Sequence, residues 1–336
     1  MAVTHVHVDN MANMAGYTPK ETAELMSRIG AQRGRARPDK IFFSAFMAGC
    51  LVSFTAASAV IGTASPWFQE NAPGLIRMIS GLIFPSGIVM ILISGSELFT
   101  GSNMITGIAW MHRRLPLKKL LLHWFLCFCG NMAGALFVMA IIVGYGGVLD
   151  NEVFKKQAIA NAQAKQLIPG WHQIFLRAIG CNWLVCLSCY LGLQAKDVTS
   201  KVAGMWWPIF AFVTMGLDHV VANMFFIPIG IFLGAPGISI GLYIWKGLIP
   251  TTLGNMLGGF FFCGFFYFYM HLLGEEPIAV DGVYYQQPER SLEEGNLFSV
   301  RSGTIVEDGG GNSSNYSGEF KRTAQAPTTV ATNKVQ

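Results

Sequence analysis

Residues 216–224 read Gly-Leu-Asp-His-Val-Val-Ala-Asn-Met, and this stretch decides the fold. It places an acid, a histidine and an asparagine near the middle of an apolar run that extends from Val202 to about Trp245. A bilayer core accepts such groups only where they face a packed interior or a water-filled path. Pro228 and several glycines also interrupt the run, which is typical of a broken helix that lines a transport site. We therefore expect a channel or transporter with its chemistry at His219.

Charged residues are scarce and clustered. They make up 12% of the 336 residues, whereas a soluble domain carries about 25%. Between the clusters lie apolar blocks, each roughly as long as a membrane helix. The blocks run over 41–65, 78–96, 120–149, 178–195, 202–245 and 247–273. The sequence thus predicts an all-α membrane protein with six transmembrane helices.

The basic residues predict how these helices are oriented. They gather before the first block, between the second and third, and between the fourth and fifth, with Lys155, Lys156 and Lys165 as exceptions. The positive-inside rule then puts both termini in the cytoplasm of a multi-pass plasma-membrane protein. The net charge of +4 reflects this pattern, and no basic motif for nucleic acid is present. The lipid bilayer is therefore the expected large partner, and nucleic acid is not.

The two ends of the chain differ from the blocks between them. Residues 1–38 form an expected cytoplasmic N-terminus, disordered up to residue 17. Its Thr18-Pro19-Lys20-Glu21 pattern starts an amphipathic helix that lies on the inner membrane face. Residues 39–274 form the six-span transport domain. Residues 275–336 are rich in Gly, Ser, Asn and Thr, which predicts a disordered cytoplasmic tail.

The chain also repeats itself. Gly130-Asn131-Met132 in the third block matches Gly254-Asn255-Met256 in the sixth. Upstream of them, Glu97 is followed by Asn103-Met104, and Asp218 is followed by Asn223-Met224. Three spans per half insert in opposite senses, so the pattern predicts an inverted 3+3 repeat with two broken helices. The small residues around both Gly-Asn-Met strings let helices approach closely.

Two polar residues of the second break are candidates for the substrate path. His219 can exchange a proton near physiological pH or, when cationic, attract an anion. Asn223 falls one helical turn later, so it can face the same path or support the broken backbone.

The first break lies in the second block, where we expect a loop over residues 94–103. Thr100 offers an uncharged hydroxyl there, and backbone at this depth must line a cavity or be buried in protein. Glu97 and Asp218 occupy corresponding places in the two halves. We favour support of the helix ends for both acids over proton relay.

Other pore candidates are less specific. Phe84 and Ile88, one turn apart, and Phe212, two turns before His219, suit an apolar narrowing, although a Phe on a membrane helix usually packs or faces lipid. Lys165, expected in an external loop, would gather anions at a pore mouth, or it is an ordinary surface lysine.

The seven cysteines all lie within apolar blocks, where we interpret them as packing residues. No pair of histidines stands at helical spacing within the spans, as a metal or redox site would require. We therefore expect no metal, no cofactor and no enzyme activity.

Taken together, five strings resemble the formate/nitrite transporter family over roughly residues 20–275. They occur in the family's order and are Phe84-Pro85-Ser86-Gly87-Ile88, Glu97-Leu98-Phe99-Thr100-Gly101, Cys181-Asn182-Trp183-Leu184-Val185-Cys186-Leu187, Asp218-His219-Val220-Val221-Ala222-Asn223-Met224 and Leu253-Gly254-Asn255-Met256-Leu257-Gly258-Gly259. The long polar tail and the extended connection before the fourth span look like the fungal nitrite transporter branch.

This resemblance implies an aquaporin-like protomer, assembled as a homopentamer with one pore per protomer. It makes His219 the central histidine and Thr100 its hydrogen-bonding partner. It places Asn182 near the path and Lys165 in a vestibule, next to an apparent insertion at 169–170. Its constriction residues are Phe84, Ile88 and Phe212.

The expected function is transport of a small monovalent weak-acid anion, with nitrite first and nitrate assimilation as the setting. A bare anion would lose much hydration energy at apolar rings, so coupling to protons through His219 is expected. Formate and lactate remain as alternative substrates. A channel for a neutral solute such as water, glycerol or ammonia is the competing class. Water and glycerol pores would show two Asn-Pro-Ala loops, and the sequence has none.

Overall fold

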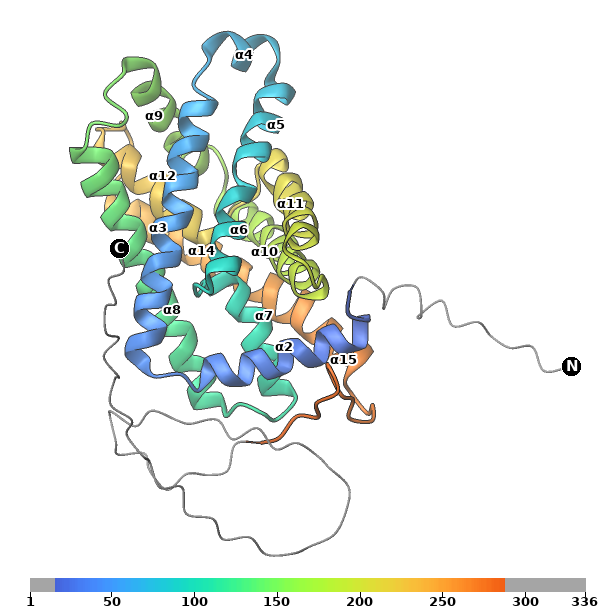
Figure 1. Cartoon of the computed structure of the whole chain (residues 1–336). Helices are drawn as coiled ribbons and strands as arrows, with labels where there is room; N and C mark the ends of the chain where they lie inside the picture. The colour runs from blue at the N-terminus through green and yellow to red at the C-terminus, as the bar shows by residue number, and fades with distance from the viewer. Residues whose placement is uncertain (1–15, 288–336) are drawn as a thin grey trace, which may run out of the picture. The chain divides into compact units, whose positions relative to one another are not determined.

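The computed structural model describes residues 16–287, and this part of the chain is built from helices (Figure 1). Within it, the strand-like pairings are two isolated bridges, one between Gly16 and Ala195 and one between Val280 and Val283. The all-α prediction is therefore confirmed. Disorder was also predicted for residues 1–15 and 288–336, which lie outside the described residues.

The first half of the chain contains eight helical elements in the described residues. They are α2 (Pro19–Gly34), α3 (Pro38–Gly62), α4 (Pro66–Asn71), α5 (Pro73–Ile83), α6 (Pro85–Ser94), α7 (Phe99–Met111), α8 (Leu117–Phe137) and the π-helical η1 (Val138–Tyr145). The second half continues in the same manner. Its elements are α9 (Glu152–Gln166), α10 (Trp171–Gln194), α11 (Val198–Met215), α12 (Val220–Phe232), α13 (Ile240–Leu242), η2 (Tyr243–Leu248), α14 (Ile249–Met256), η3 (Leu257–Phe265) and α15 (Phe266–His271).

These elements form six membrane spans. Five continuous helical segments are long and apolar enough to cross a bilayer, namely α3, α5–α6, α8–η1, α10 and α13–α15. The sixth span is the pair α11 and α12, which is bent by 45° at its break. The predicted number of spans is confirmed.

Two boundaries differ from the sequence-based expectation. The fifth apolar block was expected to run to Trp245, but α12 ends at Phe232 and the sixth span begins at Ile240. Pro236 lies in the connection, where its missing N–H and fixed φ interrupt a helix. Hydropathy alone does not register this interruption, because the residues on both sides are apolar.

The repeat is larger than the sequence indicated. Each half begins with an amphipathic helix, α2 or α9, which packs against the helix after that half's break, α7 or α12. The helix α9 replaces the external loop that we expected around Lys165. Asn151 starts it by accepting a hydrogen bond from the Val153 N–H, and Lys165 lies in its last turn, where a cation is favoured.

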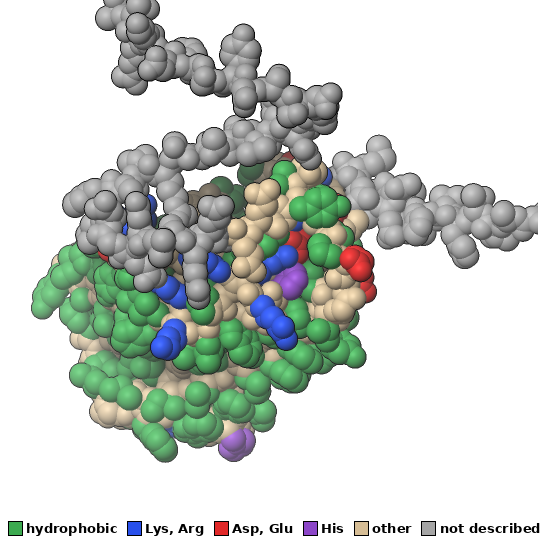
Figure 2. Space-filling view, turned by 90° about the horizontal axis from the view of Figure 1, so that it is seen from below, with side chains coloured by type: hydrophobic (Ala, Val, Ile, Leu, Met, Phe, Trp, Pro, Cys, Tyr) green, Lys and Arg blue, Asp and Glu red, His purple; other side chains and the backbone are tan. Residues whose placement is uncertain are grey.

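The two amphipathic helices mark opposite ends of the molecule (Figure 1). We call the end that carries α4 and α9 the α9 face, and the end that carries α2 and α15 the α2 face. Figure 2 looks onto the α2 face, where Lys and Arg side chains lie among apolar side chains. The helix α2 starts as its sequence pattern predicts, with a reciprocal capping box between Thr18 and Glu21.

The first residues of the predicted disordered tail lie on α2. Lys20 forms an ion pair with Glu275 at 2.7 Å. The Arg28 guanidinium donates to the carbonyl oxygens of Ile278 and Val283. Residues 275–287 are therefore held by side chains of α2, which composition does not reveal. In the same region, the hydrogen bond that Tyr17 donates to Asp281 raises the pKa of Tyr17 to about 12.

Candidate functional site

The two broken spans share one backbone design. The helices α6 and α11 each end in a left-handed glycine, Gly95 with φ 75° and Gly216 with φ 74°. This conformation favours glycine because it has no Cβ to clash. An acid follows two residues later, and the next helix starts two residues after the acid. In this register Leu98 stands at the position that His219 occupies in the second half.

An asparagine from a distant helix holds the second break. Asn255 Oδ1 accepts the Val220 N–H at 2.8 Å, at the start of α12. Its amide nitrogen donates to the carbonyl oxygens of Asp218 (3.0 Å) and Ala178 (2.8 Å). One side chain thus satisfies two buried backbone groups that the break leaves without helical partners, the Val220 N–H and the Asp218 carbonyl, and ties them to the middle of α10 through Ala178.

Asn131 does the same at the first break. It accepts the Phe99 N–H at 2.8 Å and donates to the carbonyl oxygens of Glu97 (3.0 Å) and Ala45 (2.7 Å). The sequence predicts close packing for the small residues around these strings but assigns no role to Asn131 and Asn255. The repetition of the asparagine in both halves was the signal that could have revealed it.

The structure brings His219 and Thr100 together. His219 caps α12, and its Nδ1 accepts the Ala222 N–H at 3.2 Å. Its Nε2 lies 2.9 Å from Thr100 Oγ1. Because a nitrogen that accepts an N–H bears no proton, a neutral His219 carries its proton on Nε2 and donates it to Thr100. Thr100 lies in the first turn of α7, and the expected loop over 94–103 is only four residues long, 95–98.

The acid of the second break forms a small charged cluster. Lys165 Nζ lies 3.0 Å from Asp218 Oδ1, and the Asn223 amide donates to the same oxygen at 3.3 Å. Asp218 is only 2% exposed, so the ion pair compensates a buried carboxylate. Asn223 therefore supports this acid.

The first break carries an equivalent cluster. Arg33 Nε lies 3.1 Å from Glu97 Oε1, and Ser102 donates to Glu97 Oε2 at 3.0 Å. Ser102 follows its acid by five residues, as Asn223 does. The sequence comparison pairs Asn103 with Asn223, but the structural counterpart of Asn223 is Ser102, one residue earlier. The amide of Asn103 is buried without a hydrogen-bond partner among the described residues.

A cavity of about 480 Å³ on the α9 face leads down to Asp218 and His219. Three cationic side chains line it: Arg77, Lys165 and Arg177. In the described part of the chain, neither arginine makes an ion pair or a hydrogen bond. Nothing in the sequence distinguishes these two arginines, since each is a single basic residue beside an apolar block.

The cavity narrows at the predicted constriction. Phe84 and Phe212 line both this cavity and a small apolar chamber of about 20 Å³, and their rings meet edge to face with centroids 6.1 Å apart. Ile88 and Leu98 line the chamber, and His219 borders both spaces. The histidine therefore lies where the polar cavity gives way to the apolar chamber.

Thr100 and Asn182 lie behind this surface and line neither space. The Asn182 amide donates to the carbonyl oxygens of Thr100 (3.1 Å) and Asn255 (2.6 Å). It joins the first turn of α7 to α14, so Thr100 and Asn182 hold groups behind the two spaces and touch neither of them.

Comparisons with known proteins extend over most of these helices. A sequence profile described as formate/nitrite transporter matches residues 20–269. A protein of Methanothermobacter thermautotrophicus described as a probable formate transporter is 36% identical over 268 residues, which cover 76% of this chain and 97% of that protein. An uncharacterized transporter of Saccharomyces cerevisiae is 31% identical over 260 residues, covering 76% of this chain and 41% of its own length. A solved pentameric formate channel with formate bound gives a TM-score of 0.62 at 27% identity, covering 70% of this chain and 98% of that one.

Proposed function

Because this chain belongs to the formate/nitrite transporter family, we propose that it carries a small monovalent weak-acid anion across a membrane, with nitrite as the first choice. Formate is the alternative that the names of its relatives favour, and lactate is a third. The observation that carries the proposal is the position of His219, a single imidazole at the junction of the cationic cavity and the apolar chamber.

The cavity selects for negative charge. Arg77, Lys165 and Arg177 line it, and only Lys165 is paired with an acid. A cleft with this charge raises the local concentration of anions. Water and glycerol are uncharged, so cationic side chains do not raise their local concentration, and this lining favours the anion over the neutral solute.

The constriction then favours passage of the neutral weak acid over passage of the dehydrated anion. An anion between Phe84 and Phe212 loses water without gaining hydrogen bonds, whereas the neutral weak acid loses far less hydration energy. The proton comes from water in the cavity, or from His219 after the ring has taken one up there and become cationic. Transfer to the anion returns the ring to its neutral form, with Nε2–H held by Thr100. This scheme couples anion and proton.

The proposed assembly is a homopentamer with one pore per protomer, supported by the pentameric relative of known structure. The proposed orientation puts both termini and the basic α2 face in the cytoplasm of a plasma-membrane protein. The α9 face and its cavity then open outward. The fungal nitrite branch, proton symport and a role in nitrate assimilation belong to the same proposal, as does the absence of enzyme activity.

Uptake of labelled nitrite and formate into cells that lack their own carriers tests the proposal. Uptake is measured over a range of external pH, with swelling in glycerol as the assay for the neutral-solute alternative. We expect nitrite uptake to rise as external pH falls, because each anion crosses together with a proton. No uptake of either anion at any pH, together with glycerol permeability, would overturn the assignment.

A further inference from the structure

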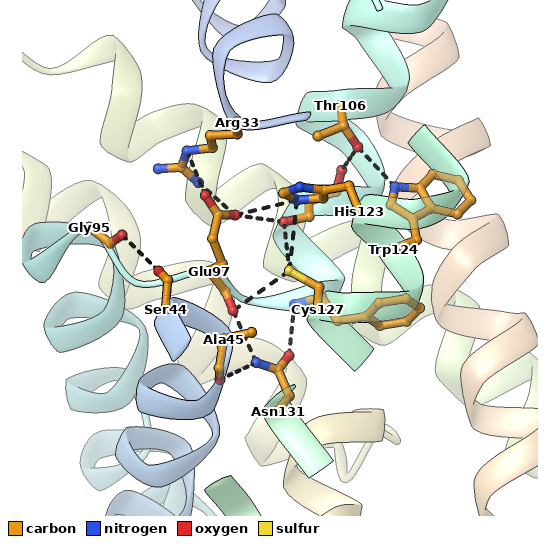
Figure 3. Close-up of polar contacts among 12 residues, drawn as sticks. Arg33, Ser44, Ala45, Gly95, Glu97, Thr106, His123, Trp124, Cys127 and Asn131 are labelled. Carbon is orange, nitrogen blue, oxygen red and sulfur yellow. Dashed lines mark hydrogen bonds and ion pairs between the residues drawn. The ribbon is translucent and has the colours of Figure 1, made fainter. Parts of the chain in front are cut away.

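The first break holds three buried side chains that the transport path does not use. The helix α8 presents His123 and Cys127, one turn apart, to the carboxylate of Glu97 (Figure 3). His123 Nε2 lies 3.6 Å from Glu97 Oε2 and 3.7 Å from Cys127 Sγ. The three potential ligand atoms all lie within 4.8 Å of one another.

These separations are those of atoms around a metal ion. Hydrogen bonds between nitrogen and oxygen are shorter, about 2.9–3.0 Å. A tetrahedral zinc ion with ligands at about 2.0–2.3 Å keeps neighbouring nitrogen, oxygen and sulfur atoms about 3.3–3.6 Å apart. Glu97, His123 and Cys127 also supply the three ligand types that zinc prefers. Ser102 Oγ lies 3.8 Å from Cys127 Sγ and provides a further oxygen beside them.

The imidazole of His123 lacks the partners that a buried histidine normally has. Its side chain is fully buried. Its Nδ1 has no hydrogen-bond partner among the described residues. Its Nε2 has only the two long contacts given above. The ring nitrogen that faces Glu97 and Cys127 is Nε2, and its contacts to both are long, so Nε2 is the atom placed to bind an ion.

The charge balance is also suitable. A carboxylate and a thiolate together match a divalent cation, and binding releases the thiol proton of Cys127. Arg33 Nε pairs with Glu97 Oε1 at 3.1 Å, whereas Oε2, the oxygen that faces His123, accepts from Ser102 at 3.0 Å and from Arg33 Nη1 at 3.4 Å. An ion bound at Oε2 would replace the hydrogen bond from Ser102. The Arg33 side chain is 23% exposed, so the buried cluster has a solvent-accessible residue as its neighbour.

The second break lacks these ligands, although its scaffold is the same. His123 and Cys127 stand eight and four residues before Asn131, the asparagine that holds the first break. The residues eight and four before Asn255 are Gly247 and Thr251. The cluster is therefore an addition to one half of the repeat and is not needed to build the break.

We propose that Glu97, His123 and Cys127 form a site for a zinc-class divalent cation at the first break. The bound ion links Glu97, in the break before α7, to α8 and holds this break rigid. This assignment departs from the sequence-based expectation of no metal, which considered only pairs of histidines and dismissed the cysteines. It does not depend on the proposed substrate.

Cobalt(II) is a suitable probe, because a thiolate ligand gives tetrahedral cobalt a charge-transfer band in the near ultraviolet. The purified full-length protein is stripped with a chelator and titrated with Co²⁺, and then with Zn²⁺. We expect one cobalt per chain, the thiolate band, loss of the band when zinc replaces cobalt, and a higher Tm in the presence of zinc.

Cys127→Ser should abolish the band and the rise in Tm, and His123→Gln should weaken binding at least tenfold. Cys129→Ser is the matched control, since its thiol lies two residues along α8 and outside the cluster. Size-exclusion chromatography verifies that each variant remains assembled. A wild-type protein without the band, or a Cys127→Ser variant that keeps it, contradicts the proposal.

Discussion

The two broken spans are alike in backbone and different in what they expose. Each has a left-handed glycine, an acid paired with a cation, and an asparagine from a later helix that holds the break. At the equivalent position before the next helix, however, the first break has Leu98 and the second has His219. The first break is covered by α2, whereas the second opens into the cationic cavity. The symmetric parts therefore build the scaffold, and we propose that the asymmetric parts carry function.

The largest expected effect comes from breaking what the two halves share. Asn255→Ala leaves two buried backbone groups of the break, the Val220 N–H and the Asp218 carbonyl, without partners, each at a cost of roughly 1–3 kcal/mol. The sum is a large fraction of the stability of a typical domain. We expect loss of the folded protein or a large fall in Tm, measured by thermal unfolding in detergent.

Asn103→Ala is the control for that experiment. Asn103 is a buried asparagine of α7, but its amide has no hydrogen-bond partner among the described residues. Its replacement should change Tm much less. Equal losses in the two variants would show that burial, and not the bracing of the break, explains the effect.

A smaller effect is expected from the contact that connects the two breaks. Thr100→Val removes the oxygen that accepts the Nε2–H of His219 and leaves that donor unpaired. An unpaired buried donor costs roughly 1–3 kcal/mol, which corresponds to about a 5- to 150-fold lower rate if the loss falls on the transition state. Nitrite uptake should fall accordingly, and Thr100→Ser, which keeps the hydroxyl, should restore most of it. A Thr100→Val variant with normal uptake at every pH would remove Thr100 from the mechanism.

The smallest effect is expected at the open end of the second break. Arg77→Gln removes an unpaired cation from the cavity without breaking an ion pair among the described residues. We expect KM for nitrite to rise several-fold with the maximal rate unchanged, and the difference to shrink at high ionic strength. Lys156→Gln is the control, because Lys156 is exposed on α9 and does not line the cavity. The same change in KM for both variants would indicate a general surface-charge effect.

The sequence revealed the elements that depend on local pattern. Apolar blocks gave the six spans, and the Thr18–Glu21 pattern gave the start of α2. The start of α7 was misplaced because no local residue caps it: Leu98 has no acceptor, and Asn131 supplies one from 32 residues away. The sequence comparison matched Asn103, and not Ser102, with Asn223. The two neighbouring polar residues can be told apart only by their distances to Glu97, which the sequence does not contain.

The candidate site residues also divide into those that a sequence pattern indicates and those that only the fold brings together. The resemblance to known transporters put His219 and Thr100 in one pair, and the geometry has them in contact. Arg77 and Arg177 were not found, because only the fold brings them to one cavity. Asn182 was expected near the path but lies behind it, since sequence position does not tell which side of a helix lines a space.

The most direct measurement compares the pH dependence of nitrite uptake in the wild-type protein and in His219→Asn. Asparagine is a good N-cap residue, so the variant can still accept the Ala222 N–H and start α12. It cannot titrate. We predict that wild-type uptake rises as external pH falls, and that the variant loses this proton coupling and leaves an anion leak. An unchanged pH profile in the His219→Asn variant would contradict a proton-coupling role for the second break.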